Sequence, residues 1–250
     1  MTAPMFPRPV AHRGLHDRAA GIIENSAAAF DAAIEKNLAI ECDLQLTSDG
    51  VAVVFHDPDR KRLQGVEGLV ADATAAEMTA TPLLDSVDRN CPQTLAQFLD
   101  QIAGRALLQI ELKHQRDATR TDTLARITAE HLANYQGPVT VESFDPDLIR
   151  LVREHGFTGL RGIITFDYEP NEWTAHLSED ERYRLKHLLH WHETEFDFIS
   201  CDKDALDMPA VRFWRELGKP VTAWTIKSHA EARDADWADQ IVFEGFDPDA

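Results

Sequence analysis

Short apolar runs with strand character alternate with longer helical stretches along almost the entire chain. The strand-like runs lie at residues 9–12, 39–44, 52–56, 107–112, 139–143, 161–165, 196–201, 221–226 and 240–244. Helices are predicted between them at residues 26–37, 94–103, 122–134, 146–155, 178–192, 209–217 and 228–237. This alternation predicts parallel strands joined by crossover helices. With 250 residues, 44% of them hydrophobic, the chain has the length of one α/β barrel, so residues 1–250 are expected to form a single domain.

The strand-like runs exceed by one the number that an eight-stranded barrel needs. Asp49-Gly50 between two apolar runs is a strong hairpin signal, so residues 52–56 are expected to return antiparallel to the preceding strand. Pairing centred between Ser48 and Asp49 would place Glu41 opposite His56. The predicted fold is therefore α/β, a TIM (β/α)8 barrel with a β-hairpin extension after the second strand.

The chain is strongly acidic, with 43 Asp and Glu against 25 Lys and Arg and a formal net charge of −18. Such a charge repels nucleic acid and anionic lipid headgroups, so no nucleic-acid partner is expected and an anionic ligand needs locally placed cations. No apolar run approaches the ~20 residues that cross a bilayer, and no signal-peptide pattern opens the chain, so neither stable membrane insertion nor export is expected. The widely spaced Cys42, Cys91 and Cys201 fit a reducing cytoplasm. No sequence feature addresses the oligomeric state.

Carboxylates stand at alternate positions on two of the predicted strands. Glu41 and Asp43 share one face of their strand, and Glu111 and Lys113 share a face of another. If both faces point to the barrel axis, three carboxylates meet at the strand ends, where barrel enzymes keep their active sites. A hard divalent cation, Mg²⁺ or Ca²⁺, would relieve their repulsion. The alternative is an ion-pair lining of the barrel mouth without a metal.

Two histidines are expected beside this cluster. His12 opens the loop after the first strand, and His56 closes the hairpin. Two imidazoles flanking a phosphate supply a general base and a general acid. Arg13 is a bidentate donor that clamps phosphate oxygens, and Lys113 offers a compact positive charge. The pattern predicts chemistry on a phosphate ester, whereas a lone histidine at a strand end would more often be a packing residue.

Three other features invite functional interpretations. Residues 166–177 form the longest loop after a strand and are expected over the catalytic end of the barrel. Tyr168 and Trp173 within it either line a pocket or pack as ordinary loop side chains, and ordinary packing is favoured. The histidines in the range 187–192 lack the distant third ligand of a helical zinc site. Cys201 has no sequence signature of a nucleophile.

The chain resembles the glycerophosphodiester phosphodiesterase family almost from end to end. The matching segments are "HRG" at 12–14, "ENS" at 24–26, "IECDLQLTSDGVAVVFHD" at 40–57, "LQIELK" at 108–113, "ESFDP" at 142–146 and "AWTI" at 223–226. The resemblance implies a TIM barrel that hydrolyses glycerophosphodiesters to sn-glycerol 3-phosphate and an alcohol with one divalent metal ion. By position it implies metal ligands Glu41, Asp43 and Glu111, an acid/base pair His12 and His56, phosphate-binding Arg13 and Lys113, and pocket walls Phe144 and Trp224.

Departures from the family pattern leave other possibilities open. "IVFEGFDP" at 241–248 replaces the usual Thr-Asp and Tyr-Pro near the last strand, which puts the contribution of that strand to substrate binding in doubt. Glu24 and Asn25 are expected to hydrogen-bond around the first loop, and a contact of Glu24 with Arg13 is left open. A phosphodiesterase for lysophospholipids or another phosphodiester is the neighbouring alternative. A non-catalytic barrel that binds phosphorylated ligands is the alternative from another class.

Overall fold

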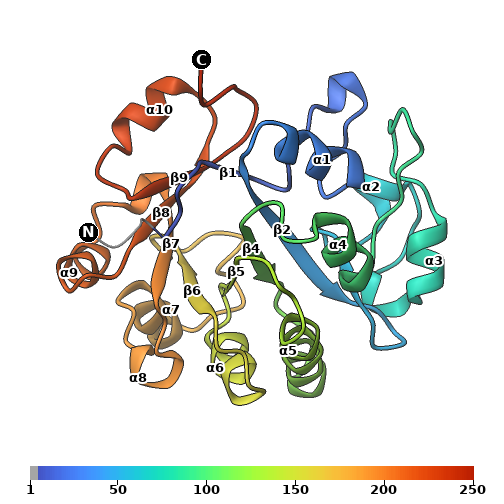
Figure 1. The fold of residues 1–250 in the computed structure, drawn as a ribbon. Coiled ribbons are helices and arrows are strands. Elements are labelled where there is room, and N and C mark those ends of the chain that lie inside the picture. The colour runs from blue at the N-terminus through green and yellow to red at the C-terminus, as the bar shows by residue number, and fades with distance from the viewer. Residues whose placement is uncertain (1–4) are drawn as a thin grey trace.

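Parallel strands close into a barrel in this computed structural model, which describes residues 5–250. Eight parallel strands form the ring within that range: β1 (Val10–Ala11), β2 (Ala39–Leu46), β4 (Leu108–Leu112), β5 (Val139–Ser143), β6 (Leu160–Thr165), β7 (Phe198–Asp202), β8 (Val221–Ile226) and β9 (Gln240–Phe243). Strand β1 pairs with both β2 and β9, and these two pairings close the ring (Figure 1). The expected TIM barrel is confirmed.

The ninth strand, β3 (Ala52–Val54), runs antiparallel to β2, as the hairpin signal predicts. The expected register is wrong by one residue, because Leu44 pairs with Val54 and not with residue 53. The backbone N–H of Thr47 donates to the carbonyl of Val51 at 3.0 Å, so the loop holds three residues. Gly50 takes φ 75° in that loop, the left-handed conformation that such three-residue connections require.

Helices surround the barrel close to their predicted positions. They are α1 (Ala27–Glu35), α4 (Leu95–Ile102), α5 (Ala118–Leu132), α6 (Pro146–Glu154), α7 (Glu179–Lys186), α8 (Trp191–Thr194), α9 (Pro209–Glu216) and α10 (His229–Asp234). Ser178 and Glu181 form a capping box at the start of α7, and Pro146 occupies the first turn of α6. The single helix expected at 178–192 is divided, because Leu188 adopts φ 52° between α7 and α8.

The segment between the hairpin and α4 contains elements that the periodicity did not predict. They are the short helices α2 (Lys61–Gln64) and α3 (Ala75–Ala80) and a 3₁₀ turn at Val70–Asp72. Further 3₁₀ turns lie at Arg18–Ala20 and Lys203–Ala205. In Figure 1, α2 and α3 lie together on the side of the barrel formed by β2 and α4. They bury a small separate core that includes Phe55, Leu63 and Met78.

The main core lies between the strands and the surrounding helices. Cys42, Leu44 and Leu112 belong to it together with Phe30 and Phe98, whose ring centroids are 4.7 Å apart. Because strand side chains alternate, the intervening positions of β2 and β4 point toward the barrel axis, as expected. The same alternation therefore builds the core and aims the polar residues of these strands at the barrel interior.

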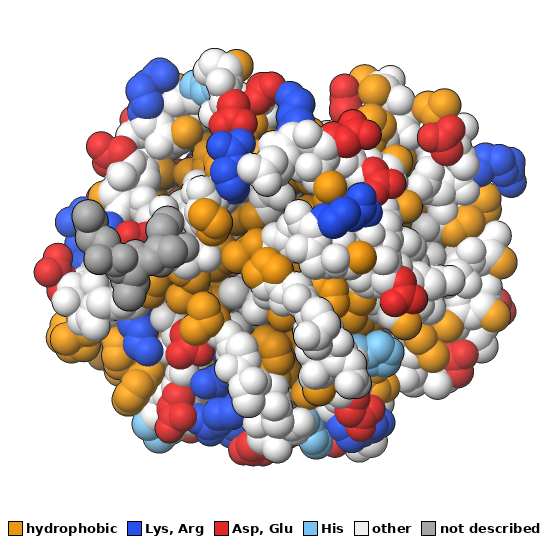
Figure 2. Space-filling view, viewed as in Figure 1, with side chains coloured by type: hydrophobic (Ala, Val, Ile, Leu, Met, Phe, Trp, Pro, Cys, Tyr) orange, Lys and Arg blue, Asp and Glu red, His pale blue; other side chains and the backbone are white. Residues whose placement is uncertain are grey.

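The surface is mixed in charge on the face that Figure 2 shows. Acidic and basic side chains are interspersed around its margin, and hydrophobic side chains are visible near its middle, over the strands of Figure 1. Across residues 5–250, the helices are all too short or too polar to cross a lipid bilayer.

Candidate active site

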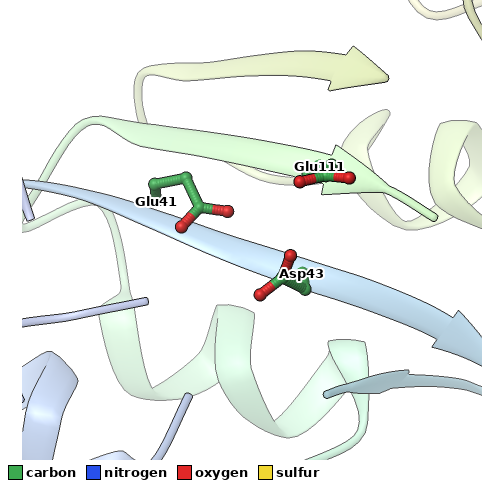
Figure 3. A group of neighbouring side chains, drawn as sticks. All are labelled: Glu41, Asp43 and Glu111. Atoms are coloured by element: carbon green, nitrogen blue, oxygen red, sulfur yellow. The ribbon is translucent and has the colours of Figure 1, made fainter. Parts of the chain in front are cut away.

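A cluster of three carboxylates lies on neighbouring strands of the barrel. Glu41 and Asp43 project from β2 and Glu111 from β4, and Figure 3 shows their carboxylates directed toward one another. One oxygen from each residue lies within 4.8 Å of the other two. Asp43 and Glu111 are register partners across the β2–β4 ladder, and Glu41 lies two residues before Asp43 on the same face. All three side chains are buried.

Burial and mutual repulsion perturb the ionisation of this cluster. Burial raises the pKa of Glu41 well above its usual range, and repulsion from Asp43 and Glu111 raises it further. Burial also raises the pKa of Glu111, against the attraction of Lys113. Burial would raise the pKa of Asp43 too, but nearby positive charges, Lys113 foremost, hold that pKa well below its usual range. The three carboxylates therefore resist full ionisation together, and a bound cation would favour the ionised form of all three.

The donor set fits a hard divalent cation. Oε1 of Glu41 is buried and has no hydrogen-bond donor within the described part of the chain. A buried carboxylate oxygen without a partner is costly, so this atom has the character of an unfilled ligand position. Carboxylate oxygens are the ligands that Mg²⁺ and Ca²⁺ prefer, whereas Zn²⁺ favours nitrogen and sulfur.

Two cations lie against the carboxylates. Nζ of Lys113 is 2.8 Å from Oδ1 of Asp43 and 2.8 Å from Oε1 of Glu111. Burial would lower the pKa of Lys113, but these two carboxylates raise it above its usual range. The backbone N–H of Arg13 donates to Oε2 of Glu41 at 2.8 Å, and its Nε lies 3.6 Å from Oδ2 of Asp43. Both cations therefore stay charged at the edge of the cluster.

His12 follows β1 and is held by the carboxylate of Glu244, which directly follows the last strand of the barrel, β9. Its Nδ1 is 2.7 Å from Oε2 of Glu244, and Lys227 Nζ is 2.8 Å from Oε1 of the same carboxylate. Burial lowers the pKa of His12 to about 4, although the hydrogen bond with Glu244 opposes this shift. The ring is therefore neutral at pH 7. Because the carboxylate can only accept, Nδ1 carries the proton and Nε2 is left as an acceptor.

His56 follows β3 and starts a chain of ion pairs that ends at Arg13. Its Nδ1 lies 2.7 Å from Oδ1 of Asp57, and Arg62 donates to Asp57 Oδ2 and to Glu24 Oε2, each at 2.7 Å. Glu24 Oε1 accepts from Nη1 of Arg13 at 2.7 Å, so the contact left open by the sequence is present. Burial would raise the pKa of Glu24, but its arginine partners lower it to about 2. The network orients both the imidazole and the guanidinium.

These groups share a cavity of about 320 Å³ in the mouth formed by loops that follow the strands. Every predicted site residue except Asp43 lines it: His12, Arg13, Glu41, His56, Glu111, Lys113, Phe144 and Trp224. Asp43 is 1% exposed and does not line the cavity, although its carboxylate belongs to the acidic cluster. The rings of Phe144 and Trp224 meet edge to face, with centroids 5.6 Å apart. Glu41 and His56 thus face one cavity despite the shifted hairpin register.

Several residues of this cavity escaped the sequence analysis. Glu142 lines it beside Glu111, and burial together with the charge of Glu111 raises the pKa of Glu142 to about 8. Its position on β5, two residues before Phe144, which directly follows that strand, was a usable signal for a shared face. Glu244 occupies the segment noted only as a departure from the family pattern. Asn25, for which only hydrogen bonds around the first loop were expected, lies outside this cavity, and its Nδ2 donates to Asp43 Oδ2 at 2.7 Å and so also orients the cluster.

The structure also tests the interpretations of the loop at 166–177, of the histidines at 187–192 and of Cys201. Trp173 is 65% exposed and lines the cavity, so the expectation of ordinary loop packing is wrong for this residue. Tyr168 is 5% exposed and stacks on Phe166 at 4.1 Å, as loop packing predicts, but it also lines a neighbouring cavity. His190 is buried and does not belong to a possible metal site. Within residues 5–250, the one group of side chains close enough together to hold a metal ion is the carboxylate cluster. Burial raises the pKa of Cys201, which keeps its thiol protonated.

Fold and cavity together define a class of protein. A TIM barrel whose mouth gathers carboxylates, cations and two imidazoles has the layout of an enzyme that hydrolyses an anionic ester. The model of the glycerophosphoryl diester phosphodiesterase family matches residues 12–249, and the chain belongs to this family. The expected family, and with it the enzyme class of a glycerophosphodiester phosphodiesterase, is confirmed.

Known relatives share sequence with this chain, and a solved structure shares its fold. Glycerophosphodiester phosphodiesterase 1 of Bos taurus is 25% identical over 249 residues, which cover 89% of this chain and 72% of that protein. The glycerophosphodiester phosphodiesterase of Caldanaerobacter subterraneus subsp. tengcongensis is 43% identical over 70 residues, 28% of each chain. A phosphodiesterase structure from Oleispira antarctica, in complex with the product sn-glycerol-3-phosphate, has TM-score 0.78 at 20% identity and covers 96% of this chain and 93% of that one.

Proposed function

We propose that this chain hydrolyses glycerophosphodiesters to sn-glycerol 3-phosphate and an alcohol with one divalent metal ion, Mg²⁺ or Ca²⁺. The observation that carries the proposal is the single cavity in which an acidic cluster, two cations and two imidazoles meet. A non-catalytic phosphate-binding barrel would need the cations but neither the carboxylate cluster nor the paired imidazoles. We further propose that residues 1–250 form one domain. We also propose that the protein acts in the cytoplasm, since Cys42, Cys91 and Cys201 are all free thiols.

Each charged group has a role in binding the diester. Glu41, Asp43 and Glu111 would hold the ion, which when bound neutralises phosphate charge and polarises the ester. Arg13 directs Nη1 to Glu24, and its buried Nε lies 3.6 Å from Oδ2 of Asp43, so Nη2 is the group that it can direct to a phosphate oxygen. Lys113 has three ammonium protons and directs two of them at carboxylates. Both side chains can therefore donate to phosphate oxygens while they remain anchored.

The two histidines move protons. One ring, whose Nε2 lacks a proton, takes a proton from the attacking hydroxyl, and the other, which enters the step protonated on both nitrogens, gives its Nε2 proton to the departing alcohol oxygen. Their Nδ1 atoms are engaged by carboxylates of Glu244 and Asp57, each at 2.7 Å, so each ring presents Nε2 to the cavity side. The carboxylates fix ring orientation and tautomer without contacting the diester themselves.

Replacing Glu244 by glutamine tests its role as a positioning residue for His12. We expect kcat to fall roughly 10- to 100-fold with little change in KM, the usual effect of losing a partner that orients a functional group. The charge and hydrogen bond of Glu244 raise the pKa of His12, so the variant should shift this pKa below about 4. NMR titration of the His12 ring measures the shift. An unchanged His12 pKa together with unchanged kcat would remove Glu244 from this role.

Hydrolysis of glycerophosphocholine, glycerophosphoethanolamine and glycerophosphoglycerol is the direct test of function. We expect release of sn-glycerol 3-phosphate, loss of activity in excess chelator, and recovery on addition of Mg²⁺ or Ca²⁺, because the carboxylate cluster needs a hard cation. The ion that restores activity at the lower concentration identifies the preferred metal. Absence of hydrolysis of every diester with either ion would favour the non-catalytic barrel.

A further inference from the structure

A second cavity of about 650 Å³ adjoins the catalytic one. It lies over the ends of β4, β5 and β6 and is bounded by the loop at residues 166–177 and by α7. His56, Lys113, Phe144 and Trp173 line both cavities. The two spaces therefore meet beside one of the histidines and beside the phosphate-binding lysine. A diester bound in the first cavity would have one substituent directed into the second.

The wall of the second cavity is mostly apolar. Phe166, Trp173, Leu177 and Leu185 contribute side chains to it together with Phe144. The aromatic members support one another, since the ring centroids of Phe144 and Phe166 are 6.0 Å apart and those of Phe166 and Trp173 are 6.3 Å apart. A small polar alcohol would leave this surface in contact with water, whereas a hydrocarbon chain would cover it.

Several charged groups of the same wall are paired within the protein, while His56, Lys113 and His176 also line it. Arg184 pairs with Glu193, and Nδ1 of His114 lies 2.8 Å from Oδ2 of Asp145. The carboxylate of Glu181 accepts from the backbone N–H of Ser178 at 2.7 Å and from its hydroxyl at 2.6 Å. Because these groups are paired, and because His56 and Lys113 lie where the two cavities meet, recognition farther into this cavity depends mainly on apolar contact.

We propose that the second cavity receives an alkyl or acyl chain carried by the phosphodiester substrate. The proposal rests on the proposed function and specifies its substrate class, namely glycerophosphodiesters that bear an apolar chain. Such a chain enters either on the alcohol that departs or on the glycerol that keeps the phosphate. In both cases water adds to phosphorus and the alcohol leaves with a proton, so the chemistry in the first cavity is the same.

Two substrate series distinguish the two positions of the chain. The first contains glycerol phosphodiesters of ethanol, butanol, hexanol and octanol, and the second contains 1-acyl derivatives of the ethyl diester with butanoyl to octanoyl chains. We expect kcat/KM to rise roughly twofold to threefold per methylene in one series, allowing for partial burial of the chain. Light scattering verifies that every substrate is monomeric at the concentrations used.

Leu185 and Leu189 provide a matched pair of variants. Leu185 lines the second cavity, while Leu189, which follows α7, is 53% exposed and lines neither cavity. Leu185→Gln should lower the ratio of kcat/KM for the octyl or octanoyl substrate to that for the ethyl diester roughly tenfold, through loss of apolar contact. Leu189→Gln should leave this ratio unchanged. If Leu185→Gln fails to fold, Leu177→Gln, at another lining position of the second cavity, provides the same comparison of substrates.

The outcomes separate the cavity from the catalytic function. A rise in either series that Leu185→Gln or Leu177→Gln abolishes supports the apolar subsite, and the series that rises identifies the side on which the chain is carried. Hydrolysis of the ethyl diester with no dependence on chain length in either series overturns the subsite and leaves the proposed function standing. Failure to hydrolyse any diester, the ethyl one included, overturns the proposed function itself.

Discussion

Replacing Glu41 by glutamine is expected to lower kcat/KM roughly 10³-fold, because a metal ligand contributes several kcal/mol to transition-state stabilisation. The same change should leave the metal-free protein at least as stable as the wild type. Burial and the charges of Asp43 and Glu111 raise the pKa of Glu41, so its ionised form is unfavourable there without a cation. A neutral amide removes this repulsion, and its oxygen can still accept from the backbone N–H of Arg13, which donates at 2.8 Å.

Glu41→Gln is expected to lose activity without losing metal-free stability, and this combination distinguishes a metal ligand from a packing residue. Thermal unfolding with and without Mg²⁺ or Ca²⁺ should show stabilisation of the wild type by the ion and little or none for Glu41→Gln. Glu35→Gln, the same exchange at an exposed position of α1, is the control and should match the wild type in both measurements. Turnover of Glu41→Gln close to that of the wild type would exclude Glu41 as a ligand. A marked loss of metal-free stability would show that packing, not charge, dominates at this position.

Substitution of His12 or His56 by alanine should lower kcat by roughly 10²- to 10⁴-fold, the range for loss of an acid or base. Both rings line the catalytic cavity, and each has its Nδ1 fixed by a carboxylate. Steady-state kinetics on glycerophosphocholine measures the loss, and circular dichroism verifies folding. His131→Ala is the matched control, since His131 lies exposed on α5.

The double variant adds information that the single variants lack. If the two histidines act in one concerted proton transfer, removing both should cost little more than removing one, because their effects are not additive. Near wild-type turnover in either single variant would remove that histidine from the mechanism. A multiplicative loss in the double variant would instead assign the histidines to separate steps.

Much of the fold could be predicted because parallel barrel strands are buried on both faces. Such strands appear as short apolar runs, and the run at 139–143 coincides with β5. The hairpin was predicted from Asp49-Gly50, but its register was not, because a three-residue loop and a two-residue turn share this signal. Helices α2 and α3 were missed since 4 and 6 residues are too few to show a helical period.

In the candidate site, contacts between near neighbours in sequence could be predicted, whereas contacts between distant segments could not. Alternation along a strand was enough to group Glu41 with Asp43 and to send Cys42 to the helices, because this geometry is local. Glu244 meets His12 across 232 residues of sequence, a contact that exists only because β9 pairs with β1. A contact that depends on closure of the barrel cannot be predicted from the spacing of residues along the sequence.

The sequence by itself determined the face of each strand, the carboxylates that share a face and the family, since these follow from backbone alternation and from side-chain chemistry. Tertiary structure alone decided which carboxylate holds each imidazole and that an apolar cavity adjoins the catalytic one. It also decided how far burial shifts the pKa of Glu41 and His12. The physical reason is that desolvation and cavity shape depend on every element packed around a point, whereas alternation depends on neighbours along the chain.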